Sequence, residues 1–347
     1  MHYLIFGTGA VGGLLGARLA LAGHPVTFLV RPRLAETLKR HGLHITGDGP
    51  HGWLKNPTIV TTLDQVFSQQ PPDVILLAVK SYDCQEAADT IRSATTESIP
   101  VVCLLNGIGN EATLASALGS ERVIPATVTT SVQMIEPGVV RVERKRGIGL
   151  ASGHNLVAQL QIEIARSSTR VYLYRNPDRM KWSKVLINIV SNATSAILGW
   201  PPWSILGHSD LCRLEVEALR EAVRVMRGLG LYPQNLPRVP VSLLGRAIFF
   251  PIPIIQPFLQ RIVSSGRGDK LPSLHYDIGR GPTEIFWLNG AIALEGQRLG
   301  VPTPANTVLT ETMRSFIEGL EDPAQFQDKP EMLLMRARQA GVPGLGQ

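Results

Sequence analysis

The stretch MHYLIFGTGAVG at residues 1–12 decides the fold of this chain. Its apolar part, Tyr3 to Phe6, predicts a buried strand, and the following residues through Ala22 predict a helix. The glycines between them follow the Gly-x-Gly-x-x-Gly spacing, which binds a dinucleotide when a strand precedes it and a helix follows. The sequence therefore predicts a dinucleotide-binding fold of the Rossmann type at the start of the chain.

Each glycine of this loop has its own expected role. Gly7 makes the tight turn, Gly9 lets a pyrophosphate approach the backbone, and Gly12 lets helix and strand pack closely. The phosphates bind at the positive end of the helix, so Ala10 and Val11 belong to the expected cofactor-binding residues.

The second predicted strand, Pro25 to Val30, leads into Arg31-Pro32-Arg33. An NAD site usually carries an acidic residue here that binds the ribose hydroxyls, and this chain lacks it. Guanidinium groups suit a 2′-phosphate, so Arg31 favours NADP(H) over NAD(H), a flavin or S-adenosylmethionine. The alternative is that Arg31 and Arg33 only begin a solvated helix.

Strands and helices continue to alternate after this point. Residues 73–79 and 99–105 are predicted as buried parallel strands with a helix between them. Ligands of such a doubly wound sheet lie at the carboxyl ends of its strands, where Lys80 and Asn106 stand. Residues 123–150 carry short β-branched segments and turns, which predict antiparallel strands that complete the domain.

The character of the sequence becomes helical after Asn176 and stays so to the C terminus. We therefore predict an α/β chain with a Rossmann-type NADP-binding domain at residues 1–176 and an all-helical substrate-binding and catalytic domain at residues 177–347. No Ser/Gly-rich linker separates them, so we expect direct packing with a cleft between the domains.

Composition excludes several classes of protein. The net charge is +6, but the basic residues are scattered and not interleaved with stacking aromatics, so we expect no nucleic-acid partner. The densest basic run, Arg141 to Arg146, is interpreted as the solvated edge of a sheet. No signal peptide precedes the first strand, which predicts a cytoplasmic enzyme.

The three cysteines, Cys84, Cys103 and Cys212, lie far apart in the chain. Their odd number argues against a disulfide framework, and their spacing is not that of a metal site. We expect no metal and interpret them as small core or helix residues.

A second informative segment runs from Trp182 to Ser195. No charged residue occurs from Val185 to Ser209, although a water-facing helix normally uses charges. The polar side chains predict one stripe along a single helix that lines a cleft: Lys184, Asn188, Ser191, Asn192 and Ser195. The alternative is an ordinary solvated face.

Glu284 follows Pro282-Thr283 in a late segment that begins near Ser273. From the residues alone, Glu284 is either a first-turn acid that complements a helix dipole or a catalytic group.

Together these segments resemble the ketopantoate reductase family, the NADPH-dependent 2-dehydropantoate 2-reductases. The resemblance covers most of the chain, and as an ordered set the motifs are specific. They are GTGAVGG at residues 7–13, Arg31, AVKSY around Lys80, LLNGIGN around Asn106, WSKVLINIVSN at residues 182–192, PTEIFWLNG at residues 282–290 and GVPTPANT from Gly300.

The resemblance implies a hydride transfer from NADPH to the ketone of a 2-oxo acid. It implies Lys184 as the general acid and Glu284 as the acid that holds Lys184 and the substrate hydroxyl in place. The remaining roles come from the same source: Asn188 and Asn192 bind the distal hydroxyl of the substrate, Ser273 binds its carboxylate, and Lys80 and Asn106 lie near the nicotinamide and ribose.

Three departures from the family pattern leave the substrate open. Phe286 replaces an acidic residue, Pro202 stands where a further substrate-contacting amide can occur, and the turn from Asp277 to Glu284 is one residue short. The alternatives are a reductase of the same fold for a bulkier, more apolar 2-oxo acid, and a non-catalytic NADP-binding sensor. The complete set of matching polar residues argues against the sensor.

The segment from Ala247 to Gln260 contains no charge and three prolines. It is too short and too broken to span a bilayer. We expect its apolar side chains to be buried in the helical domain or against a second subunit, and to narrow the cleft mouth. A lid over the cleft, a homodimer contact and a shallow membrane attachment are the alternatives.

Overall fold

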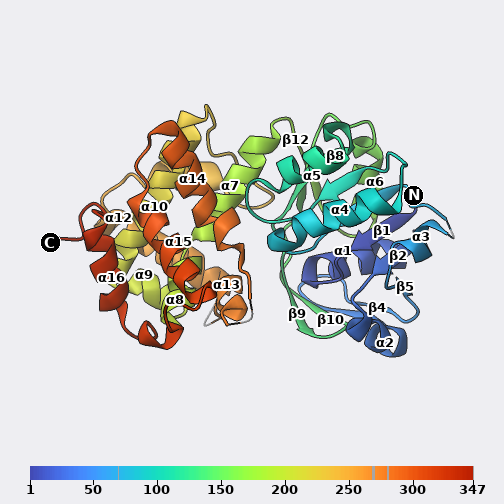
Figure 1. Cartoon of the computed structure of the whole chain (residues 1–347), viewed down its shortest axis with the longest axis horizontal. Coiled ribbons are helices and arrows are strands. Elements are labelled where there is room, and N and C mark those ends of the chain that lie inside the picture. Colours follow the sequence, from blue (N-terminus) through green and yellow to red (C-terminus); the bar gives the residue numbers. More distant parts are fainter. Residues whose placement is uncertain (69, 268–269, 280, 347) are drawn as a thin grey trace. The chain divides into compact units, whose positions relative to one another are not determined.

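The chain divides into two units. The computed structural model describes residues 1–68, 70–267, 270–279 and 281–346. The N-terminal unit contains Met1–Lys181 and Leu236–Val239, and the C-terminal unit contains Trp182–Asn235 and Pro240–Gln347 (Figure 1). The division falls inside one helix, α7 (Pro177–Ile189), which begins where the predicted helical domain begins.

The N-terminal unit is built on an eight-stranded sheet in the order β12-β11-β8-β7-β6-β1-β2-β5. Neighbouring strands are parallel, except that β11 runs antiparallel to β8. The predicted α/β alternation is confirmed. The strands are β1 (Tyr3–Phe6), β2 (Val26–Leu29), β5 (Thr58–Val60), β6 (Val74–Leu77), β7 (Val101–Cys103), β8 (Val123–Val128), β11 (Ile148–Ala151) and β12 (Val171–Tyr174).

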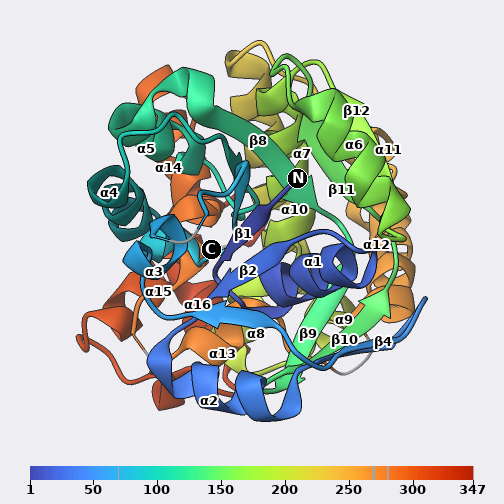
Figure 2. The same cartoon turned by 90° about the vertical axis from the view of Figure 1, so that its right-hand side faces the viewer.

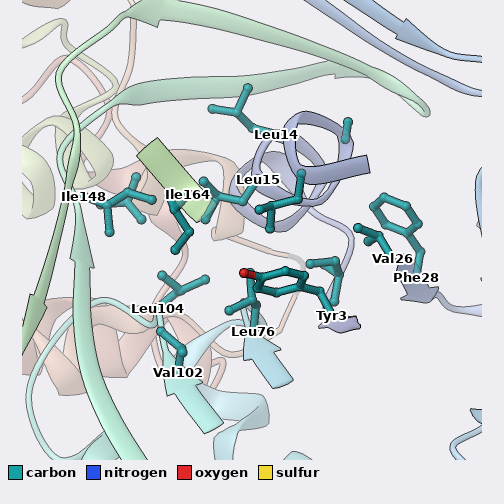
Figure 3. Packing of buried hydrophobic residues seen from close by; sticks show 14 of the residues in the cluster. Tyr3, Leu14, Leu15, Val26, Phe28, Leu76, Val102, Leu104, Ile148 and Ile164 are labelled. Atoms are coloured by element: carbon teal, nitrogen blue, oxygen red, sulfur yellow. The ribbon is translucent and has the colours of Figure 1, made fainter. Parts of the chain in front are cut away.

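Helices cover both faces of this sheet, because the strands are apolar on both sides. In β1, Tyr3 and Ile5 pack into one hydrophobic core and Leu4 into the other. Figure 3 shows the first core, where Leu14 and Leu15 of one helix lie over Tyr3, with Ile164 of another helix close by. The helices are α1 (Ala10–Leu21) and α6 (Val157–Arg166) on that face, and α4 (Cys84–Ala94) and α5 (Asn110–Leu118) on the other.

A second sheet of four strands lies beside α1 (Figure 2). Its order is β4 (Gly52–Leu54), β3 (Leu43–Gly47), β10 (Val139–Arg144) and β9 (Ser131–Glu136). The shorter elements of the unit are α2 (Pro32–His41), α3 (Asp64–Phe67) and the 3-10 helices η1 (Ser81–Asp83) and η2 (Ser120–Arg122).

The pairing of these strands corrects two expectations. β8 is parallel to β7 and β10 is parallel to β3, so the antiparallel prediction for residues 123–150 holds only for the β9–β10 and β8–β11 pairs. β10 also lies between β3 and β9, so the basic run is not a sheet edge. Val140 and Val142 of β10 are buried, while Arg141 faces solvent. Strand partners distant in sequence decide both points, and local patterns do not carry that information.

The C-terminal unit is helical, as predicted. Its long helix α10 packs against several others, and most of its residues are buried. The helices after α7 are α8 (Asn192–Leu198), α9 (Pro202–Gly207), α10 (Ser209–Gly228), α11 (Val241–Ala247), α12 (Ile252–Arg267), α13 (Ser273–Asp277), η3 (Glu284–Trp287), α14 (Asn289–Leu299), α15 (Pro304–Ile317), η4 (Pro323–Gln325) and α16 (Pro330–Gln339). The turn from Asp277 to Glu284 includes Arg280, which lies outside the described residues.

The uncharged segment forms the end of α11, a short loop and the first part of α12. One side is buried as expected, through Ile248, Ile255 and Leu259. The expected burial is wrong for the opposite side of the segment within this chain, because a surface helix buries only one face. Burial of that side against a second subunit stays a prediction. Its side chains are Phe249, Phe250 and Ile254, which are 37%, 56% and 62% exposed.

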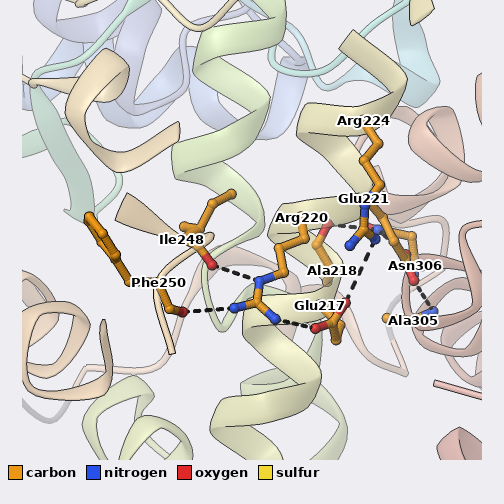
Figure 4. A network of polar contacts seen from close by, with 9 residues as sticks. All are labelled: Glu217, Ala218, Arg220, Glu221, Arg224, Ile248, Phe250, Ala305 and Asn306. Carbon is orange, nitrogen blue, oxygen red and sulfur yellow. Dashed lines mark hydrogen bonds and ion pairs between the residues drawn. The ribbon is translucent and has the colours of Figure 1, made fainter. Parts of the chain in front are cut away.

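Arg220 of α10 binds the backbone of this uncharged segment. Its guanidinium donates to the carbonyl oxygens of Ile248 at 2.7 Å and Phe250 at 2.8 Å (Figure 4). The Glu217 carboxylate holds the same guanidinium at 2.6 Å. Two carbonyl groups of this segment are therefore satisfied by a side chain distant in sequence.

All three cysteines are buried and free, Cys84 in α4, Cys103 in β7 and Cys212 in α10. Their interpretation as core or helix residues is confirmed. No helix within the described residues is both long and apolar enough to cross a membrane.

Candidate functional site

The glycine loop between β1 and α1 is shaped by close packing. Gly7 has φ +99°, and a Cβ there would lie 2.7 Å from the carbonyl carbon of Ala78. A Cβ on Gly12 would lie 2.1 Å from the Gly7 carbonyl oxygen, so helix and strand tolerate only glycine. The Cβ position of Gly9 has nothing within 4 Å. The loop thus has two glycines fixed by packing and one that faces open space.

A cavity of about 820 Å³ opens beside this loop. It lies within the N-terminal unit, at the carboxyl ends of β1, β2 and β6. Four of the predicted cofactor residues line it together: Gly7, Gly9, Arg31 and Lys80. Four others are not part of its lining: Ala10, Val11, Gly12 and Asn106.

Arg31 lies at the start of α2 and at the wall of the cavity. Its guanidinium is 3.1 Å from the Asp83 carboxylate. Burial raises the pKa of Asp83, and the Arg31 charge opposes that rise. Sequence reasoning missed Asp83, although its position just after Lys80 in a strand-end loop was a usable signal.

Asn106 lies in the loop after β7, next to the loop that begins with Lys80. The backbone carbonyl oxygen of Asn106 accepts hydrogen bonds from Ser81 Oγ at 2.8 Å and Asn110 Nδ2 at 2.7 Å. These bonds join the loops that follow β6 and β7. Ser81 and Asn110 are further positioning residues that sequence reasoning missed.

Lys181 fixes the start of α7 in the N-terminal unit. Its buried ammonium donates to the Leu105 carbonyl at 2.6 Å and pairs with Glu111 at 2.7 Å. Burial is the largest influence and lowers the pKa of Lys181, but the charge and hydrogen bond of Glu111 together with Cys103 and Cys84 outweigh it, so the net direction is upward. The ammonium therefore stays charged, three residues before Lys184.

The predicted polar stripe is divided between two helices. Lys184 and Asn188 are half-buried on α7, whereas Asn192 and Ser195 are buried on α8. Ser191 separates the helices with φ +52°, a left-handed conformation that a continuous helix excludes. The expectation of a single helix is therefore wrong.

A buried carboxylate from α10 explains this break. Glu215 accepts the backbone N–H of Ser191 at 2.6 Å and the hydroxyl of Thr194. These donors belong to the first turn of α8, whose N–H groups have no partner inside the helix. A negative charge there also complements the helix dipole. Glu215 thus caps α8 from a distant part of the chain.

Glu221 of α10 caps α15 in the same way (Figure 4). It accepts the backbone N–H groups of Ala305 at 2.8 Å and Asn306 at 2.9 Å, and the Asn306 side chain at 2.7 Å. Burial raises the pKa of Glu221 to about 7, against the effect of these hydrogen bonds.

The sequence held a signal for buried acids in α10. Glu215 follows Leu211 by one helical turn and therefore lies on the apolar face of the helix.

The remaining predicted residues follow in α13 and η3. The side-chain oxygen of Asn192, Oδ1, accepts a hydrogen bond from the Leu274 backbone N–H at 3.4 Å. This bond brings Asn192 to the start of α13, beside the exposed Ser273. Glu284 begins η3 and is only 3% exposed, and the preceding Thr283 caps this turn through the Ile285 N–H. Glu284 is thus a buried carboxylate in the C-terminal unit, to which Lys184 also belongs.

Comparison with protein families matches two models in succession. "Ketopantoate reductase PanE/ApbA" matches residues 3–154, and "Ketopantoate reductase PanE/ApbA C terminal" matches residues 176–317. The chain belongs to the ketopantoate reductase family. It is therefore an oxidoreductase of the type that acts on CH–OH groups, and the family's cofactor is NADP(H).

Individual ketopantoate reductase relatives cover the chain nearly from end to end. A 2-dehydropantoate 2-reductase of Pyrococcus horikoshii is 29% identical over 89% of this chain and 95% of its own length. A 2-dehydropantoate 2-reductase of Aquifex aeolicus is 26% identical over 91% of this chain and 96% of its own length. A solved ketopantoate reductase structure from Ralstonia eutropha matches with 28% identity and a TM-score of 0.78, covering 92% of this chain and 99% of that one.

Proposed function

We propose that the chain reduces 2-dehydropantoate (ketopantoate) to pantoate with NADPH, by hydride transfer to the 2-oxo group. The cavity that unites Gly7, Gly9, Arg31 and Lys80 carries the proposal, in a chain of the ketopantoate reductase family. The relatives named 2-dehydropantoate 2-reductase support the substrate.

The residues of the cavity fit NADPH. The open space at Gly9 suits the pyrophosphate, and the first N–H groups of α1, at Ala10 and Val11, are donors for its oxygens. Arg31 offers its guanidinium to the 2′-phosphate, and Gly12 keeps the loop close to β1. When bound, NADPH supplies the hydride.

Lys184 is the proposed general acid. It donates a proton from Nζ to the ketone oxygen, and its positive charge stabilises the alkoxide that develops only in the transition state. Glu284, held by the capped turn at Thr283, orients the Lys184 ammonium and the substrate hydroxyl.

The other polar groups orient substrate and cofactor. Asn188 and Asn192 bind the distal hydroxyl; since the Asn192 carbonyl oxygen accepts from Leu274, its Nδ2 group donates. Ser273 binds the substrate carboxylate. Lys80 and Asn106 contact the nicotinamide and ribose.

A second candidate function rests on Phe286, which stands where the family has an acid. Its ring is partly exposed and lies edge-to-face with the Trp287 ring, with the ring centroids 6.5 Å apart. An apolar group here favours a bulkier, more apolar 2-oxo acid over ketopantoate.

The test is NADPH oxidation with a panel of 2-oxo acids that includes ketopantoate. The proposal expects the highest kcat/KM with ketopantoate. Activity confined to larger apolar acids supports the second candidate. NADPH binding without turnover of any acid contradicts both and leaves a sensor.

The proposed partners of the chain are its small 2-oxo acid substrate and a second copy of the chain in a homodimer. We propose that it acts in the cytoplasm and binds no nucleic acid. Sedimentation of the purified chain measures the oligomeric state.

A further inference from the structure

A cluster of positive charge lies on the N-terminal unit, and none of its residues lines the cofactor cavity. Its centre is Arg18, in the last turn of α1, which is only 5% exposed. Arg18 Nη1 donates to the Thr169 hydroxyl at 3.3 Å. Its Nε and Nη2 atoms are buried and have no acceptor in the part of the chain that the structure describes. A buried guanidinium edge without an acceptor is costly, and in native proteins it commonly binds an ion or water.

Two further cations belong to this cluster. Lys145 is half-buried just after β10, and Arg170 is the exposed neighbour of Thr169. Burial, followed by the charges of Arg18 and Arg170, lowers the pKa of Lys145, and Asp48 opposes this shift. The Asp48 carboxylate itself accepts the backbone N–H of Lys145 at 2.7 Å. The cluster therefore combines three cations with one carboxylate.

Two of the cations, Arg18 and Lys145, converge on the space above Gly49. A Cβ on Gly49 would lie 3.7 Å from Lys145 Nζ and 3.8 Å from Arg18 Nη2. Gly49 is an exposed residue with φ +103°, a conformation that favours glycine, so the turn leaves this point without a side chain. An atom at this position, on an exposed residue, lies within 4 Å of both nitrogen atoms.

We infer that this cluster binds a tetrahedral oxyanion, either free inorganic phosphate or the phosphate group of a small metabolite. Arg18 Nε and Nη2 form the fork that binds two oxygens of a phosphate, and Lys145 adds a point charge to a third. The basic run at Arg141 to Arg146 thus contributes one residue, Lys145, to a site that its interpretation as a solvated edge did not include. The inference does not depend on the proposed reductase reaction.

The test is a titration of the full chain with inorganic phosphate at constant ionic strength, followed by amide NMR. The backbone N–H signals of Gly49 and Arg170 should shift along one saturable curve. The signals of Gly7 and Gly9 report separately on phosphate at the cofactor loop. Lys145→Gln should weaken binding at Gly49 about tenfold, because it removes a charge-assisted contact without emptying the buried Arg18 position.

Lys39→Gln is the matched control, since it removes a lysine charge from α2 outside the cluster and should leave the Gly49 curve unchanged. Glycerol phosphate forms the second arm: tighter binding than inorganic phosphate assigns the site to phosphorylated metabolites, and weaker binding assigns it to the free ion. No saturable shift at Gly49 up to about 50 mM phosphate, well above a millimolar Kd, overturns the inference. Equal binding by Lys145→Gln also overturns it.

Discussion

The cofactor loop of the N-terminal unit and the start of α8 in the C-terminal unit are held by different means. In the loop, Gly12 packs against the carbonyl of Gly7, its near neighbour in the chain. At α8, the Ser191 N–H binds Glu215, which is 24 residues further on and in another helix. A site built from adjacent backbone can be recognised in a sequence, whereas one held by distant buried carboxylates depends on the packed helices.

Apart from Lys184→Ala, the largest effect is expected for Glu284→Gln. If Glu284 orients Lys184 and the substrate, the loss of its charge should lower kcat/KM for ketopantoate by about two to three orders of magnitude. Steady-state kinetics measure this, with calorimetric NADPH binding as the second readout. Glu311→Gln, which alters an exposed carboxylate of α15, is the control. A Glu284→Gln enzyme with near-normal kcat/KM contradicts the proposed pair.

Glu215→Gln tests the distant cap of α8. A glutamine side chain has only one oxygen and no charge, so it cannot replace both hydrogen bonds of the Glu215 carboxylate, to the Ser191 N–H and the Thr194 hydroxyl. The free energy of unfolding should therefore fall by about 1.5–3 kcal/mol. Turnover should fall with it because Asn192 begins the capped helix, while the NADPH affinity should not change. Urea unfolding and kinetics measure the two effects.

The matched control for this experiment is Glu217→Gln. Glu217 lies on the same helix and is also buried, but it pairs with Arg220 and does not bind α8. It should lose stability and keep its turnover. Equal loss of turnover in both variants shows that general loosening of α10, and not the cap, affects the site.

The Glu221 cap makes stability depend on pH. Its pKa is raised from 4.5 to about 7 in the folded chain, so the folded state binds a proton that the unfolded state releases. The contribution of Glu221 to the free energy of unfolding should therefore fall as pH rises from about 4.5 to about 7, by about 1–3 kcal/mol, and stay level above. Glu221→Gln should remove this slope in urea unfolding, and the exposed Glu331→Gln should keep it. The same slope in Glu221→Gln argues against a raised pKa.

Arg31→Ala probes the site built from the local motif and is expected to give the smallest effect. It should narrow the preference for NADPH over NADH by about tenfold, as expected for one charge-assisted phosphate contact. Arg40→Ala, in the last turn of α2 and outside the cavity lining, is the control. Calorimetric titration with both cofactors measures the ratio. Equal wild-type affinity for NADPH and NADH contradicts the role of Arg31.

The sequence predicted the α/β unit because β1, the glycine loop and α1 follow one another and determine each other's geometry. It did not predict the pairing of β10 with β3, whose strands are distant in the chain. It treated residues 184–195 as one helix, because nothing local in that segment reveals the Glu215 cap. Asp83 was missed because its partner Arg31 follows β2, whereas Asp83 follows β6, and the two strands are distant in the sequence.

The most direct test compares wild type and Lys184→Ala in two measurements on the same preparations: turnover of ketopantoate with NADPH, and the Kd for NADPH. The account predicts that kcat falls by about two to four orders of magnitude, because both the proton donor and the charge beside the alkoxide are lost. The Kd should stay within about twofold, a difference well under 1 kcal/mol, because the proposed cofactor contacts lie in the N-terminal unit. Near-normal turnover by Lys184→Ala, or a parallel loss of NADPH binding, would contradict it.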